Sequence, residues 1–152
     1  MYKWQKNGRM AEGAKAAILD QITPVTENAA PGSVDIIIEA VFEDIDLKDT
    51  VIAETWPMLS EDGIYGSNTS TLPISILAES CPDPTRFIGL HFFSPVDKMK
   101  VVEIIMGEKT NEETLRKAYD YVQQIGYMPI GVNDSRRFFT SRVFGTFRGE
   151  GG

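Results

Sequence analysis

Residues 34–42 form a nearly unbroken apolar run, VDIIIEAVF, directly after a Pro-Gly turn signal. A short run this rich in Val and Ile is typical of a strand buried on both faces of a parallel sheet. Five further strands are predicted, at 22–26, 64–68, 86–93, 100–107 and 127–132. Because Pro24 cannot donate a ladder hydrogen bond, the first of these is expected at a sheet edge.

Helical spacing of apolar residues separates most of these strands. Helices are predicted at 10–20, 43–59, 70–80 and 108–126, with another beginning at 138–146. EDG at 61–63 is expected to end the second helix, Ser70 or Thr71 to cap the third, and Gly126 to follow the fourth. Thr110 or Asn111 is the expected N-cap of that fourth helix. Alternation of strands and helices indicates βαβ units, so the predicted fold class is α/β with a largely parallel sheet.

Length and net charge limit the number of domains and the classes of ligand that this chain can bind. The chain has 152 residues, enough for about one domain, and its single Cys81 cannot form an internal disulfide. A net charge of −7 disfavours nucleic-acid binding, and an anionic cofactor would have to be held by local dipoles. The N-terminus has no signal-peptide pattern and no apolar run is long enough to span a bilayer. We therefore expect a soluble, cytoplasmic protein.

A polar cluster, SNTST at 67–71, lies directly after a predicted strand and before a predicted helix. In open α/β sheets, ligands bind outside the carboxyl ends of the strands, where hydroxyls and free helix N–H groups collect. The simpler interpretation is a strand-to-helix turn with a Ser or Thr cap, and the residues alone favour it.

His91, the only histidine, and Glu103 lie on successive predicted strands. If the chain folds back about Asp97, midway between them, the two side chains face each other. A carboxylate bound to one imidazole nitrogen fixes the tautomer and leaves the other nitrogen free to exchange a proton. The alternatives are a core histidine beside two phenylalanines and a surface glutamate, but a buried unpaired carboxylate among Val and Ile would be costly.

Four ordered motifs carry a resemblance to a known family: VDIIIEAVFEDIDLK, GSNTSTLPIS, RFIGLHFFSPVDKMKVVEII and NDSRRFFTSRVF. They resemble the L-3-hydroxyacyl-CoA dehydrogenase family over most of residues 10–148, and look closest to the dehydrogenase part of multifunctional fatty-acid β-oxidation enzymes. The resemblance implies a Rossmann-like NAD-binding domain with helices on both faces of its sheet. It also implies NAD-dependent oxidation of L-3-hydroxyacyl-CoA to 3-ketoacyl-CoA.

The resemblance also implies roles for individual residues. His91 would be the general base, Glu103 would orient it, and Ser70 would hydrogen-bond the reacting oxygen. Cofactor contacts would come from Glu43, Lys48, Ser70 and Ser94, the last standing where many relatives carry Asn. The substrate would be a 3-hydroxyacyl-CoA, and full-length relatives are homo-oligomers or parts of a multienzyme complex.

The sequence departs from the family pattern in several places. It has thirteen glycines but no GxGxxG phosphate loop, and Arg137 and Ser141 replace a Gly and an Asn of many relatives. We expect residues 1–134 to be a partial NAD-binding domain lacking its first βαβ unit. Residues 135–152 would begin a helical C-terminal domain. The alternatives are a non-catalytic remnant that cannot bind NAD and a Rossmann dehydrogenase acting on a non-CoA hydroxy acid.

Overall fold

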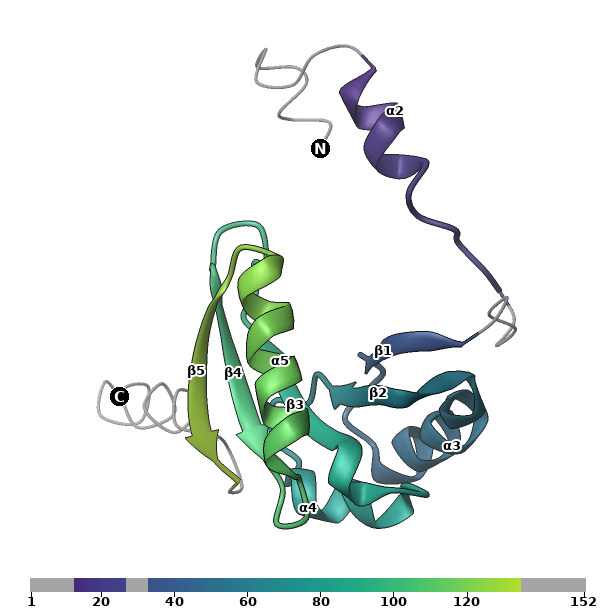
Figure 1. The fold of residues 1–152 in the computed structure, drawn as a ribbon, viewed down its shortest axis with the longest axis vertical. Helices are drawn as coiled ribbons and strands as arrows, with labels where there is room; N and C mark the ends of the chain where they lie inside the picture. The colour runs from purple at the N-terminus through teal and green to yellow at the C-terminus, as the bar shows by residue number, and fades with distance from the viewer. Residues whose placement is uncertain (1–12, 27–32, 135–152) are drawn as a thin grey trace, which may run out of the picture.

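The computed structural model describes residues 13–26 and 33–134, and their centre is one five-stranded sheet (Figure 1). The strands are β1 Val34–Glu39, β2 Leu59–Ser67, β3 Phe87–Phe92, β4 Val101–Met106 and β5 Met128–Asn133, in the order β1-β2-β3-β4-β5. β1, β2 and β3 run parallel, β4 is antiparallel to β3, and β5 is parallel to β4. The largely parallel α/β sheet predicted from the sequence is confirmed.

Helices cover both faces of the sheet. The helices are α2 Ala14–Leu19, α3 Ile45–Thr55, α4 Ile74–Leu77 and α5 Glu112–Gln124, with short 3₁₀ turns at Trp56–Met58, Ala78–Ser80 and Pro84–Arg86. Of these, α2 has no buried residue. α5 packs on one face through Ala118 and Val122, while α3 and α4 cover the other. The chain therefore builds two apolar layers, one on each side of the central strands.

The alternation of side chains along β3 and β4 explains the two layers. Phe87 and Ile105 point to the α3–α4 side, and Leu90 and Ile104 point to the α5 side, all of them fully or almost fully buried. On the first side, Trp56, Tyr65 and Phe87 form a continuous stack with ring centroids 5.6 Å apart. Strands that are apolar on both faces need helices on both sides of the sheet.

The two ends of α5 and the hairpin between β3 and β4 follow the sequence prediction. Asn111 caps α5 by accepting the Thr114 amide at 2.8 Å, and Gly126 follows that helix with φ of 78°. Between β3 and β4 the chain reverses at Pro95, whose carbonyl accepts the amides of Lys98 and Met99 at 3.0 Å. The reversal about Asp97 is confirmed, and it pairs His91 with Glu103 in register.

Three predictions for residues 22–63 are wrong. Residues 22–26 form no strand: Ile22 and Val25 are 58% and 61% exposed, and no described strand lies beside them. β1 ends at Glu39, short of residue 42, and lies at an edge, so its isoleucines are half-buried rather than covered on both faces. EDG at 61–63 lies inside β2, because a register shift between Val34 and Ile36 lets β2 begin at Leu59.

The expected cap of α4 is also wrong. Neither Ser70 nor Thr71 caps it; Pro73 occupies the N-cap position without a side-chain hydrogen bond. The carboxylate of Asp134, beyond the end of β5, accepts the amides of Ile74 and Ser75 at 2.8 Å instead. The cap is supplied across space, which local spacing does not reveal. The helix predicted at 138–146 and the domain start predicted at 135–152 lie outside the described residues.

No helix among the described residues is long and apolar enough to cross a bilayer.

Replacing Gly89 by alanine should destabilise the fold. A Cβ there would meet the Cδ1 atoms of Ile74 and Ile105 at 2.8 Å, in the layer on the α3–α4 side, where both isoleucines are fully buried. Overpacking of this kind costs about 1–3 kcal/mol of unfolding free energy. Urea denaturation measures it, with the exposed Ser80→Ala as a control expected within about 0.5 kcal/mol of the parent. An unchanged midpoint for Gly89→Ala would contradict the packing described here.

Stability should fall at alkaline pH. Burial raises the pKa of the Cys81 thiol and of the Tyr65 phenol to about 12, whereas unfolded Cys and Tyr have pKa values of about 8.5 and 10. The folded chain holds protons that the unfolded chain releases, so the unfolding free energy declines as pH rises from about 9 to 12. Chemical denaturation across that range tests this. Cys81→Ala should abolish the part of this decline in unfolding free energy that begins near the pKa of the unfolded Cys81 thiol.

Candidate active site

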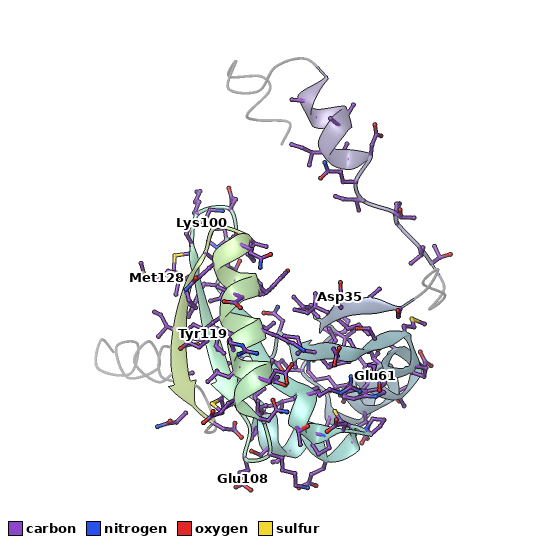
Figure 2. The ribbon with its side chains drawn as sticks, in the orientation of Figure 1. Asp35, Glu61, Lys100, Glu108, Tyr119 and Met128 are labelled. Carbon is purple, nitrogen blue, oxygen red and sulfur yellow. The ribbon has the colours of Figure 1, made fainter. Side chains whose placement is uncertain are left out.

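The carboxyl ends of β1, β2 and β3 meet at one edge of the sheet. In Figure 2, Lys100 and Glu108 mark the two ends of β4; the Lys100 end is where β3 passes into β4, so it is the edge at which β3 ends. Three segments reach that edge: the turn after Glu39, the loop 67–70, which begins with the last residue of β2, and His91 near the end of β3. Parallel strands thus gather polar side chains from distant parts of the sequence.

His91 and Glu103 form a buried pair. His91 Nδ1 lies 2.8 Å from Glu103 Oε2, and the two residues are 7% and 1% exposed. Because a carboxylate only accepts, Nδ1 carries the proton and Nε2 is left as an acceptor. The antiparallel step between β3 and β4 sets this geometry, since it places the two residues directly opposite each other.

Ser70 meets the other side of the imidazole. Its Oγ lies 3.1 Å from His91 Nε2, so the hydroxyl donates to the unprotonated nitrogen. Ser70 is half-buried, and the ring of Phe93 lies against the imidazole with centroids 4.7 Å apart. The result is a line of hydrogen bonds, Glu103 to His91 to Ser70, that ends at the surface of the molecule.

The loop that carries Ser70 is held by two glutamates. The Glu43 carboxylate accepts the Thr69 hydroxyl at 2.7 Å and the Ser70 amide. The Glu39 carboxylate accepts the Ser67 hydroxyl, and the Glu39 carbonyl accepts the Asn68 amide at 2.9 Å. Glu43 itself is exposed, so it can hold the loop and still face a ligand at this edge.

Lys48 and Ser94, the other two residues predicted to contact the cofactor, lie outside the line of hydrogen bonds from Glu103 to His91 to Ser70. Lys48 is fully buried, and its Nζ is 2.9 Å from both carboxylate oxygens of Glu39. Ser94 is exposed in the loop that follows β3. The structure therefore brings together His91, Glu103, Ser70 and Glu43, while the Lys48 ammonium is directed into the interior.

Two further residues hold this site together: Glu39, which was not predicted as a site residue, and Asn68, which lies in the predicted polar cluster 67–71. Glu39 ends the apolar run of β1 with a charge, and a lysine nine residues later is the signal that it has a partner. Asn68 accepts the Phe92 amide at 2.9 Å through Oδ1 and so ties the loop to β3. Asn68 belongs to the polar cluster SNTST singled out in the sequence, but the sequence does not reveal its partner, because that partner lies on another strand.

The chemistry available is proton transfer beside a hydroxyl. His91 Nε2 is a neutral acceptor oriented by a carboxylate, and Ser70 supplies a donor at the same point. Among residues 13–26 and 33–134, no group of three or more His, Cys, Asp and Glu side chains is placed to hold a metal ion.

Comparison with known proteins gives a consistent picture. The family model "3-hydroxyacyl-CoA dehydrogenase, NAD binding domain" matches residues 1–135. The (S)-3-hydroxybutyryl-CoA dehydrogenase of Ralstonia eutropha is 34% identical with a TM-score of 0.88, over 93% of this chain and 50% of that one. The 3-hydroxybutyryl-CoA dehydrogenase of Escherichia coli is 26% identical with a TM-score of 0.81, over 88% and 28%.

A further similar structure is the dehydrogenase part of multifunctional enzyme 1 from C. elegans, 25% identical with a TM-score of 0.77, over 88% of this chain and 31% of that one. The chain thus spans half the length of the Ralstonia enzyme and less of the others. The sheet is Rossmann-like, as the resemblance implied, and the cofactor of the matching domain is NAD. The chain belongs to the 3-hydroxyacyl-CoA dehydrogenase family, within its NAD-binding domain.

Proposed function

We propose that this chain carries the catalytic residues of an L-3-hydroxyacyl-CoA dehydrogenase, which oxidises the 3-hydroxyl to a ketone with NAD in fatty-acid β-oxidation. The observation that carries the proposal is the line Glu103–His91–Ser70, with distances of 2.8 and 3.1 Å, at the carboxyl edge of the sheet. An alcohol can lose hydride only if its proton is removed, and His91 Nε2 is a base held in position for that task.

Each side chain has a defined part in the proposed reaction. The Ser70 hydroxyl, which donates to Nε2 here, turns to the substrate oxygen when that oxygen takes its place. His91 Nε2 accepts the hydroxyl proton, and the Glu103 carboxylate stabilises the imidazolium that forms. NAD supplies the hydride acceptor when it is bound. The proton and the hydride leave the same carbinol group, so the product is the 3-ketoacyl-CoA.

The described residues fit the reacting end of the cofactor. Glu43 and Ser70, at the same edge as His91, would hold the nicotinamide end of the cofactor, which would supply the hydride acceptor. Ser94 is exposed in the loop after β3. The pyrophosphate end has no such match, since the sequence contains no GxGxxG loop. Lys48 is buried against Glu39, so it contributes through the loop it supports.

Substitutions of His91 and Glu103 should lower the rate of substrate oxidation. Replacing His91 by alanine is expected to lower kcat for 3-hydroxybutyryl-CoA oxidation about 10²- to 10⁴-fold, because the base is lost. Glu103→Gln should also lower kcat, since the amide no longer stabilises the imidazolium. NADH production at fixed cofactor is the measurement. The control is Glu108→Gln, which changes an exposed carboxylate beyond the opposite end of β4 and should leave kcat unchanged. Turnover retained by His91→Ala would contradict the proposal.

NADH binding to the 152-residue chain is the second test. Calorimetry should show micromolar binding if the nicotinamide edge and the rest of the chain suffice to hold the cofactor. Absence of heat up to millimolar NADH would favour the other candidate, a non-catalytic remnant, for which the missing GxGxxG loop is the specific observation. The two outcomes decide whether these 152 residues bind the cofactor by themselves.

A further inference from the structure

An ion pair lies inside the protein next to the proposed site. Lys48 Nζ is 2.9 Å from both Glu39 oxygens, and the two side chains are 0% and 1% exposed. Burying two charges costs several kcal/mol each, and a well-packed apolar pair of similar volume is often as stable. Stability alone therefore gives no reason for charges here, and the hydrogen bonds of the pair show what else it does.

Both oxygens of Glu39 are engaged by the segments that leave β1 and β2. One accepts the Ser67 hydroxyl, at the last residue of β2. The other accepts the Val41 amide at 3.1 Å, and Lys48 Nζ reaches the Val41 carbonyl at 3.4 Å. The pair thus fixes the course of the chain at two places, on the turn toward Glu43 and at the start of the loop toward Ser70.

From these two places the contacts converge on Ser70. Along the first route, the turn at Val41 leads to Glu43, whose carboxylate accepts the Ser70 amide. Along the second, the Glu39 carbonyl accepts the Asn68 amide at 2.9 Å, two residues before Ser70. Ser70 Oγ then lies 3.1 Å from His91 Nε2. An apolar pair could fill the space of Glu39 and Lys48 and would keep the backbone bond to Asn68, but it could not make the side-chain hydrogen bonds to Ser67 and Val41.

We propose that Glu39 and Lys48 are positioning residues: their buried ion pair holds the loop 67–70 so that the Ser70 hydroxyl meets His91 Nε2. This rests on the proposed function for its catalytic meaning. The geometry it asserts concerns only side chains of this chain. Loss of the pair should therefore release Ser70 from the imidazole while the Glu103 bond on the other nitrogen persists.

The single histidine makes the test direct. Long-range ¹H–¹⁵N spectra of the labelled chain show one imidazole, so its Nδ1 and Nε2 shifts report the two hydrogen bonds separately. Ser70→Ala gives the reference shift for an Nε2 without its serine. The double variant E39Q/K48M, which leaves no unpaired buried charge, is expected to move Nε2 toward that reference and to leave Nδ1 in place.

A surface ion pair provides the matched control. Glu113 and Lys117 on α5 pair at 2.8 Å with side chains 57% and 35% exposed, so E113Q/K117M should leave both shifts of His91 unchanged. A folded E39Q/K48M protein, verified by its dispersed amide spectrum, with parental shifts at Nε2 would overturn the proposal. So would an equal movement of both nitrogens, because that indicates general loosening of the fold.

A second variant decides the matter if the double variant does not fold. Ser67→Ala keeps both charges and removes one hydroxyl bond to Glu39. It should move Nε2 in the same direction as Ser70→Ala by a smaller amount, and an unchanged Nε2 in Ser67→Ala would then overturn the proposal. Since no substrate or cofactor is present, failure of this proposal is distinct from failure of the dehydrogenase activity, which only the turnover assay addresses.

Discussion

A charge or hydroxyl enclosed between two helix-covered faces of a sheet must find a partner, and this requirement shapes the whole carboxyl edge of the protein. Glu103 is paired with His91, and Glu39 is paired with Lys48. Each partner comes from a different element, so satisfying the buried groups also ties those elements together. The apolar layers fix where the strands lie, and the polar pairs fix how the segments that leave them are directed.

The single antiparallel step has a large effect on the chemistry. If β4 ran parallel to β3, the crossover needed would place Glu103 far along the chain from His91. The hairpin instead sets the two residues opposite each other, after only the short turn at Pro95. An otherwise parallel sheet thus acquires a paired acid and base in its interior, one strand away from the loop that carries Ser70.

The sequence was sufficient for the elements that depend on local pattern. Apolar runs identified β3 and β4, and the midpoint argument placed His91 against Glu103. It failed where an element depends on what lies beside it. β1 has the composition of a central strand but lies at an edge, and α4 receives its cap from Asp134, sixty residues later. The resemblance implies that the Lys48 ammonium lies near the cofactor, whereas the packing of α3 against β1 directs it to Glu39. That lysine's predicted cofactor role stays a prediction.

The hairpin also bears on the order in which the site assembles. His91 and Glu103 are twelve residues apart in the chain. Ser70 is twenty-one residues from His91, and Glu39 is twenty-eight residues from its partner Ser67. Closing a shorter loop costs less entropy, and contacts of low sequence separation form faster. The acid–base pair therefore belongs to a local unit that can close early, and the parallel strands complete the site around it afterwards.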